Sequence, residues 1–257
     1  MNIQMNITAG DGYISQSQKV RRITEEWAGQ NLFCAACESN RVITSANNTQ
    51  AIDFVCPECG ASYQLKAGQR WNERRIPDAG YNAMIAALQS DQVPNLLVMQ
   101  YSQKWFVENL MLIPSFFFSQ SAVEKRQPLG ANARRAGWVG CNILLYAISE
   151  QGKIRLITDG NIHQPQMIRN QYKLLYPLSN INTGIRGWTL DVLRILQDLQ
   201  SPSFTLDTVY RFEHKLAKIY PNNHHIREKI RQQLQVLRDL QFIDFLGSGR
   251  YQIRKVQ

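Results

Sequence analysis

Residues 53–66 read Asp-Phe-Val-Cys-Pro-Glu-Cys-Gly-Ala-Ser-Tyr-Gln-Leu-Lys, and this stretch decides the fold of the first part of the chain. Its Cys56-Pro-Glu-Cys59 pair repeats the spacing of an earlier pair, Cys34-Ala-Ala-Cys37, and 18 residues lie between the two. A two-residue spacer lets both thiolates of a pair face one ion, so two pairs predict a tetrahedral zinc site rather than disulfides. Four thiolates leave no open position for water, and the predicted Zn²⁺ is therefore structural. Two separate redox pairs are the alternative.

The polar ends of the same stretch would meet if the second cysteine pair is the turn of a hairpin. The chain then runs out through Asp53 and returns through Lys66, with Gln64 and Lys66 on one strand face and Leu65 on the other. This order resembles the PD-(D/E)xK nuclease core. Asp53 and Gln64 would hold Mg²⁺ with the Leu65 carbonyl, and Lys66 would orient or deprotonate the attacking water. An exposed acid and a solvated lysine at a sheet edge are the alternative.

Periodicity divides the chain into a mixed part and a helical part. In the mixed part we expect helices over 16–30 and 79–90, strands over 62–66, 96–99, 105–113, 141–148 and 153–158, and exposed loops over 67–78 and 119–140. Small polar residues at 179–184 predict a boundary, which gives domains of 1–182 and 183–257. The fold class is α+β, with a zinc ribbon inserted at about residues 31–60 of the first domain.

The second domain has the outline of a winged helix-turn-helix. Helices are expected over 188–200, 205–219 and 224–241, followed by short strands over 242–245 and 251–253 that a Gly-rich turn joins. Asn222 and Asn223 are expected to cap the last helix. Its apolar stripe predicts a core face, and the opposite face carries polar side chains that match base edges: His224, Arg231, Gln232 and Gln235. Arg250 in the turn would contact phosphate; an ordinary solvated face is the alternative.

Charge favours a polyanionic partner. The chain has 29 Lys and Arg against 20 Asp and Glu, a net charge of +9, and residues 183–257 carry 12 basic against 7 acidic side chains. Such an excess attracts nucleic acid through counterion release. No apolar run reaches the roughly 18 residues that a bilayer requires, and no leader pattern opens the chain. We therefore expect no membrane association, a cytoplasmic location and a monomer in solution.

The chain resembles the DpnI-like family of methyl-directed (type IIM) restriction endonucleases over almost its whole length. Four segments carry the resemblance: Lys19–Trp27 with the two cysteine pairs, Asp53–Lys66, Ala133–Asn142, and Arg186-Gly-Trp188 with Ile226–Asp239. The resemblance implies a zinc-bearing PD-(D/E)xK nuclease domain followed by a winged helix. It also implies a type II site-specific deoxyribonuclease that needs Mg²⁺ and cuts both strands of double-stranded DNA at GATC when the adenine is methylated.

One residue departs from that family. The family has glutamate where this chain has Gln64. An amide oxygen can still bind a metal ion, but it contributes no negative charge, so we expect weaker metal binding rather than loss of cleavage.

Trp138 is the expected reader of the methyl group in the first domain. It lies between two glycines and close to Arg134 and Arg135, which could contact phosphate or guanine. A flat ring suits a methyl group, and the resemblance supports this role. A tryptophan that fills the core beside Cys141 is the alternative.

Two other functions stay open. The first is a DNA-binding regulator, or a reader of modified DNA, that combines a zinc ribbon with a winged helix and does not cleave; Gln64 would then be a sign of lost activity. The second is a nuclease that recognises a different DNA modification.

Overall fold

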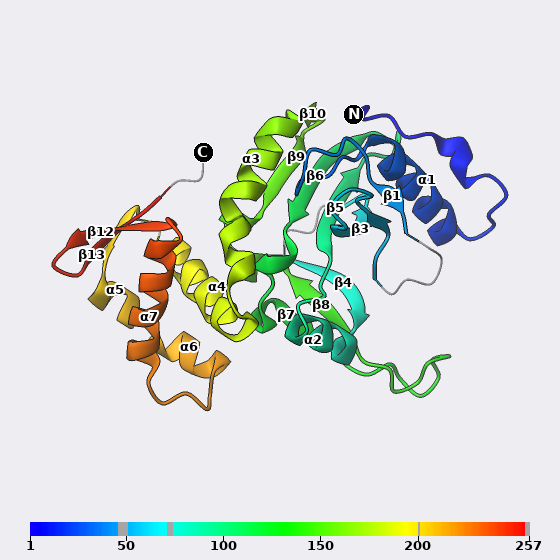
Figure 1. The fold of residues 1–257 in the computed structure, drawn as a ribbon. Helices are drawn as coiled ribbons and strands as arrows, with labels where there is room; N and C mark the ends of the chain where they lie inside the picture. Colours follow the sequence, from blue (N-terminus) through cyan, green and yellow to red (C-terminus); the bar gives the residue numbers. More distant parts are fainter. Residues whose placement is uncertain (46–50, 71–73, 200, 255–257) are drawn as a thin grey trace. The chain divides into compact units, whose positions relative to one another are not determined.

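The computed structural model is a mixed α+β chain (Figure 1) and describes residues 1–257 except 46–50, 71–73, 200 and 255–257. Contacts divide it into two compact units. The first unit contains residues 1–73, 94–115 and 153–175, and the second contains residues 74–93, 116–152 and 176–257. Each unit therefore combines separate parts of the sequence, and the predicted boundary after residue 182 falls inside the second.

A mixed sheet forms the core of the first unit. Its described strands follow the order β1 (Ile43–Thr44), β2 (Phe54–Val55), β3 (Ser62–Gly68), β5 (Asn95–Tyr101), β6 (Val107–Ile113), β9 (Ile154–Thr158) and β10 (Asn161–Ile162). β3 and β5 run parallel, whereas the other neighbours are antiparallel. β5 is buried at almost every position, as its continuous apolar sequence predicts.

Helices pack on this sheet through apolar stripes. α1 (Gln16–Asn31) buries Ile23 and Trp27, and the 3₁₀ helix η1 (Ile7–Gly10) packs against it. α3 (Pro165–Leu175) packs on β9 and buries Ile168, Tyr172 and Leu175. Since burial of such side chains contributes roughly 1.5–3 kcal/mol each, these stripes fix both helices on the sheet.

A smaller antiparallel sheet lies in the second unit. It has the order β4 (Arg75–Gly80), β8 (Gly140–Leu144) and β7 (Val123–Lys125), and α2 (Tyr81–Gln89) follows β4. Short 3₁₀ helices join the remaining segments: η2 (Ser115–Phe117), η3 (Gln120–Ala122), η4 (Leu145–Ala147), η5 (Glu150–Gly152) and η6 (Tyr176–Asn180). Residues 126–139 form a long extended loop between β7 and β8, drawn in green in Figure 1.

The C-terminal part of the second unit has the predicted helix-turn-helix order and a wing. Its elements are α4 (Thr183–Asp198), β11 (Ser203–Thr205), α5 (Leu206–Tyr210), α6 (Glu213–Ile219), α7 (Ile226–Asp239), β12 (Ile243–Gly247) and β13 (Arg250–Ile253). α7 buries Ile226, Ile230, Leu234 and Leu237, so the predicted core face is confirmed. β12 and β13 form the wing, with β13 between β11 and β12.

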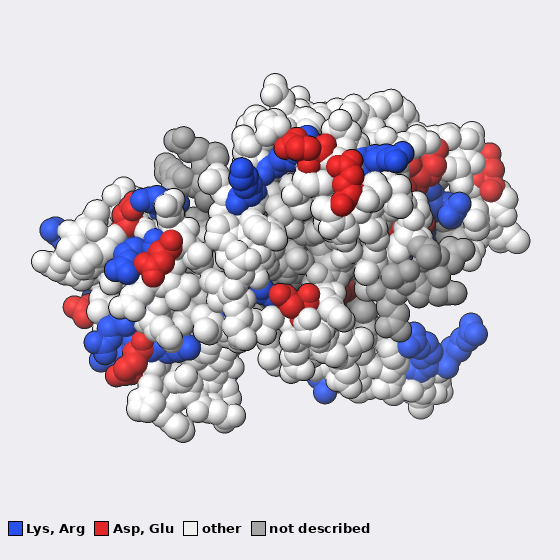
Figure 2. All heavy atoms as spheres, viewed as in Figure 1, with Lys and Arg blue, Asp and Glu red and all other residues white. Residues whose placement is uncertain are grey.

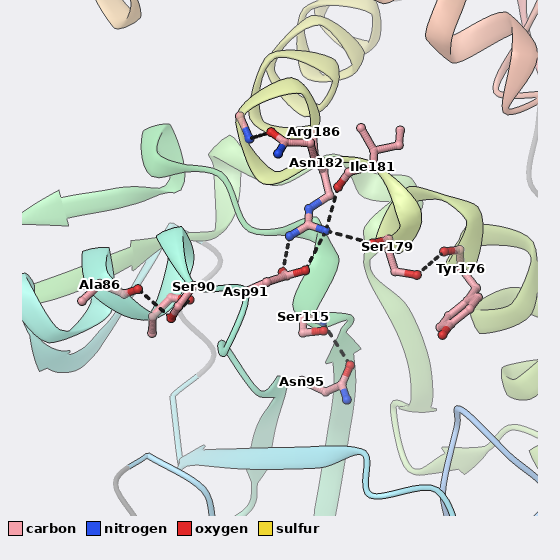
Figure 3. Close-up of polar contacts among 12 residues, drawn as sticks. Ala86, Ser90, Asp91, Asn95, Ser115, Tyr176, Ser179, Ile181, Asn182 and Arg186 are labelled. Atoms are coloured by element: carbon pink, nitrogen blue, oxygen red, sulfur yellow. Dashed lines mark hydrogen bonds and ion pairs between the residues drawn. The ribbon is translucent and has the colours of Figure 1, made fainter.

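Two polar clusters around buried side chains, Arg186 and Asp191, anchor α4. The Arg186 guanidinium donates to the Asp91 carboxylate and to the carbonyls of Ser179 and Ile181 (Figure 3).

One turn further along the helix, the buried Asp191 carboxylate accepts hydrogen bonds from the hydroxyls of Ser119, Ser121 and Tyr220. Burial raises the pKa of Asp191, and the three hydroxyls oppose that shift.

Several predicted elements were wrong in type or extent. Residues 67–78 were expected to be a loop, but β4 lies at the edge of the small sheet, where Pro77 is tolerated. β7 likewise lies inside the predicted loop 119–140. The helix expected over 205–219 is divided into α5 and α6, and α4 begins at Thr183 with Asn182 as its cap. α3 and β11 were not predicted.

The predicted cap of α7 was also wrong. His225 is the N-cap residue, and no side chain caps it. Asn223 instead accepts a hydrogen bond from the His225 N–H at 2.8 Å, which stabilises the turn before the helix.

Candidate functional site

The two cysteine pairs come together into one cluster. Among the described residues, Cys34, Cys37, Cys56 and Cys59 form a group whose sulfur atoms all lie within 4.8 Å of one another. The Cys34–Cys59 and Cys37–Cys56 sulfur distances are 3.6 and 3.5 Å. A tetrahedral Zn²⁺ with bonds of about 2.3 Å would place its sulfur ligands about 3.8 Å apart. The four side chains therefore fit such an ion.

The surroundings shift the thiol pKa values of this cluster in different directions. Burial would raise the pKa of Cys56, but hydrogen bonds from the backbone N–H groups of Cys59 and Glu58 and from the neighbouring cysteines lower it to about 7. Burial raises the pKa of Cys37 and of Cys59. A backbone hydrogen bond also holds the turn at Cys56–Cys59, because the Gly60 N–H donates to the Cys56 carbonyl at 3.0 Å. Gly60 has a φ of +74°, which glycine adopts without strain.

The Cys56–Cys59 pair is the turn of a hairpin, as predicted. β2 and β3 are antiparallel neighbours, with Phe54 opposite Tyr63. The Asp53 N–H donates to the Tyr63 carbonyl at 2.9 Å, so the pairing continues one residue beyond β2. The Asp53 carboxylate accepts a hydrogen bond from the Leu65 N–H at 2.7 Å. Asp53 therefore lies against the backbone between Gln64 and Lys66.

β3 carries the other two predicted catalytic side chains, Gln64 and Lys66, and pairs with the neighbouring strand β5. Gln64 pairs with Leu96 and Lys66 pairs with Val98 on β5. Gln64 is buried, with 8% of its surface exposed, and Lys66 is half-buried. Residues 64 and 66 of a strand share a face, so the sheet fixes both side chains on one side.

α1 adds two charged residues that the sequence interpretation missed. Arg21 donates to Glu25 at 2.6 Å, and Glu25 is largely buried while Arg21 is exposed. The pKa of Arg21 is raised first by its hydrogen bond to Glu25 and also by the charge of Asp53. The i, i+4 spacing brings Arg21 and Glu25 together on one helix. The position of α1 relative to Asp53 depends on tertiary packing, so no local sequence pattern indicated it.

In the second unit, Trp138 lies at the base of the loop 126–139. The ring is half-buried, so it is not the core residue that the alternative required. A Cβ on Gly140 would come within 2.8 Å of this ring, so only glycine allows so close an approach. The Arg135 guanidinium lies 4.8 Å from the ring centre, and Arg134 and Arg135 are both exposed. Figure 2 shows basic side chains at this loop.

The predicted DNA-facing side chains of the winged helix are exposed on the structure. These are His224, Arg231, Gln232, Gln235 and Arg250. A cleft of about 780 Å³ lies at the start of α7 and is lined in part by His224, Gln232, Trp188 and Tyr220. The Trp188 and Tyr220 rings stack with centres 3.6 Å apart, and Asp191 holds the Tyr220 hydroxyl at 2.6 Å. Sequence periodicity did not indicate this aromatic pair, because its members lie on different elements.

The predicted residues thus form separate groups. Asp53, Gln64, Leu65, Lys66 and the cysteine cluster belong to the first unit, whereas Trp138, its neighbouring arginines and the winged-helix residues belong to the second. None of the helices in the described ranges has the length and apolar character needed to cross a bilayer.

Fold and site together define a two-part protein, with an α+β part that carries a four-cysteine cluster and a C-terminal winged helix-turn-helix for DNA. The chain belongs to the DpnI family, because the Dam-replacing family pattern matches residues 1–180 and the Dam-replacing HTH domain pattern matches residues 184–253. The predicted family and the predicted α+β fold with a C-terminal helix-turn-helix are therefore confirmed. Membership supports a methyl-directed restriction endonuclease.

Proposed function

We propose that this protein hydrolyses both strands of double-stranded DNA at GATC sites whose adenine is methylated, with Mg²⁺ as catalytic cofactor and Zn²⁺ as structural ion. One observation carries the chemical part. The Asp53 carboxylate hydrogen-bonds the backbone at Leu65, between Gln64 and Lys66 on the same strand. Family membership supports the choice of DNA as substrate.

The proposed active site is a PD-(D/E)xK site built from Asp53, Gln64 and Lys66. Asp53, the Gln64 amide oxygen and the Leu65 carbonyl would hold Mg²⁺, and oxygen donors of this kind are those that Mg²⁺ prefers. When bound, the ion would neutralise charge on the scissile phosphate. Lys66 would orient the attacking water or help to deprotonate it, and the second of these is the role of a positioned general base.

Gln64 changes the charge of this site but not its position. Glutamine has nearly the shape of glutamate, so Gln64 would offer an amide oxygen to the ion with one negative charge fewer. Fewer ligand charges weaken binding of a divalent ion. The enzyme would therefore need more Mg²⁺ than a relative with glutamate at this position.

We assign recognition of the methylated adenine to two regions of the second unit, the loop 126–139 with Trp138 and the winged helix. The half-buried Trp138 ring offers an apolar surface for one methyl group, and Arg134 and Arg135 offer charge for phosphate or guanine. His224, Arg231, Gln232 and Gln235 would read base edges from α7, whose first residues enter the major groove in such domains. Arg250 in the wing would contact phosphate. A single methyl contact contributes only about 1 kcal/mol. Contacts to a methyl group in each of two regions would therefore give a stronger preference for methylated DNA.

A second candidate is a reader of methylated DNA that does not cleave. The neutral Gln64 favours it, because a site with one carboxylate fewer binds Mg²⁺ more weakly. The winged helix, the cysteine cluster and the family would be the same in both cases.

Supercoiled plasmid decides between these functions. Purified protein with Mg²⁺ should cut plasmid that carries adenine methylation into linear fragments, and should leave unmethylated and cytosine-modified plasmids intact. Lys66→Ala should lower the cleavage rate by about 10³-fold, while Lys104→Ala, at an exposed lysine in the same unit, should not. Binding of methylated DNA without cleavage by the unaltered protein would support the reader, and cleavage of only the cytosine-modified plasmid would assign a different modification.

A further inference from the structure

Arg169 reaches from α3 to the first cysteine pair. Its guanidinium donates to the carbonyl oxygens of Cys34 at 3.2 Å, Glu38 at 3.1 Å and Ser39 at 2.9 Å. It also donates to the side chains of Glu38 and Asn40, both at 3.1 Å. The Arg169 side chain is only 10% exposed. One guanidinium therefore makes five hydrogen bonds to a segment about 130 residues away in sequence.

The two cysteine pairs obtain their support in different ways. Residues 56–61 stabilise themselves, because the Cys56 and Gly60 N–H groups donate within the same hairpin. The first pair lies outside any strand pairing, and its turn is closed by the Cys34 N–H, which donates to the Ser39 carbonyl at 3.0 Å. A turn whose amides face sulfur directs carbonyls outward, and these need donors. Arg169 supplies donors to three of them.

Arg169 also suits the charge of the cluster. Four thiolates around Zn²⁺ carry a net charge of −2, so a cation held beside them stabilises the bound state. The Glu38 carboxylate that pairs with Arg169 is 76% exposed, and such an exposed ion pair contributes little. We therefore expect the effect of Arg169 to come mainly from its hydrogen bonds to the carbonyls of Cys34, Glu38 and Ser39.

We infer that Arg169 is a positioning residue of the zinc centre, which holds the first cysteine pair in the geometry that binds the ion and balances the charge of its thiolates. The inference rests on the zinc part of the proposed function and is independent of DNA cleavage. Groups that contact metal ligands in this way commonly change metal affinity by roughly 10–100-fold when they are replaced.

The test measures zinc release rather than activity. Full-length protein is mixed with a chromophoric chelator, and the rate of zinc transfer is followed for the unaltered protein, Arg169→Met, Arg169→Lys and Lys173→Met. Lys173 is an exposed cation on the same helix and serves as the matched control. We expect zinc release about tenfold faster for Arg169→Met. Arg169→Lys should release zinc at an intermediate rate, because lysine keeps the positive charge but lacks the planar guanidinium that donates several hydrogen bonds at once. Lys173→Met should release zinc at the unaltered rate.

A second readout separates geometry from general stability. Cobalt-substituted protein should show the absorption of a tetrahedral tetrathiolate site, and Arg169→Met should shift or weaken it while circular dichroism stays unchanged. Release within twofold of the unaltered rate by a folded Arg169→Met would overturn the inference; if that variant does not fold, an unaltered rate for Arg169→Lys would do so. Unaltered protein that purifies without zinc would overturn the zinc assignment as well, while leaving the proposed nuclease untouched.

Discussion

The hairpin of residues 53–66, proposed to be catalytic, and the elements proposed to read DNA, the loop 126–139 and α7, differ in how the chain positions their side chains. In the hairpin, a turn and two strands fix Asp53 against Leu65 within a few residues. In the reading elements, Arg134, Arg231 and Gln235 are exposed and lie on segments far apart in sequence. Contacts that are close in sequence therefore fix the hairpin side chains, whereas the proposed reading residues are exposed and spread over distant segments.

The largest effect should come from removing the lysine of the hairpin. Lys66→Ala should lower the cleavage rate on methylated plasmid by about 10³-fold, because the attacking water loses its positioned base. Affinity for a methylated duplex, measured by fluorescence anisotropy with Ca²⁺ in place of Mg²⁺, should change less than threefold. A parallel loss of binding would show that chemistry and reading are not separable.

Removal of one zinc ligand should break the hairpin itself. Cys56→Ser should lose bound metal and most cleavage, since a structural Zn²⁺ in small domains contributes about 10–16 kcal/mol of folding free energy. Thermal melting and elemental analysis would measure both losses. Cys141→Ser, at a buried cysteine outside the cluster, should keep its metal; equal losses in the two variants would argue against a zinc-held hairpin.

A carboxylate at position 64 should change the Mg²⁺ dependence of cleavage and leave DNA recognition unchanged. Gln64→Glu restores a carboxylate, so the Mg²⁺ concentration for half-maximal cleavage should fall by about tenfold, or about 1.4 kcal/mol in metal binding. A Mg²⁺ titration of plasmid cleavage would measure the shift. An unchanged Mg²⁺ dependence would mean that Gln64 does not contact the ion.

The reading elements should respond more weakly. Trp138→Ala should reduce the ratio of cleavage rates on methylated and unmethylated plasmids by about fivefold, because a single methyl contact is worth about 1 kcal/mol. Arg134→Ala is the contrast, since loss of a phosphate contact should slow both reactions equally and keep the ratio. A ratio that is unchanged in Trp138→Ala would place methyl recognition elsewhere.

The smallest effect is expected at the wing. Arg250→Ala should weaken duplex binding about equally for all sequences and reduce the slope of log affinity against log salt by about 1. Anisotropy titrations at several salt concentrations would measure it. Lys218→Ala, at an exposed position of α6, is the control and should leave the slope unchanged.

The same contrast explains what the sequence could predict. Cysteine spacing and strand alternation indicated the hairpin, its turn and the cluster, because those contacts are close in sequence. The helical periodicity of apolar residues and the Gly-rich turn predicted the helix-turn-helix and its wing. The predicted domain boundary and the roles of individual site residues stay predictions.

The misses were features that local pattern does not encode. β4 was missed because Pro77 interrupts an edge strand, and α3 because its polar face hid the stripe through Ile168 and Tyr172. Arg169 was missed because tertiary packing alone brings it to the first cysteine pair. The packing of α1 likewise determines that the charge of Asp53 acts on Arg21.

The buried carboxylate of Asp191 has a consequence for protein engineering. Its hydrogen-bond donors include Ser119 and Ser121, which lie outside the segment that matches the HTH domain pattern. A chimera that joins only residues 183–257 to a relative would keep these contacts only where the relative has hydroxyls at the positions of Ser119 and Ser121 and an acid at the position of Asp91. Grafts of this winged helix should therefore carry residues 91 and 119–121 with them.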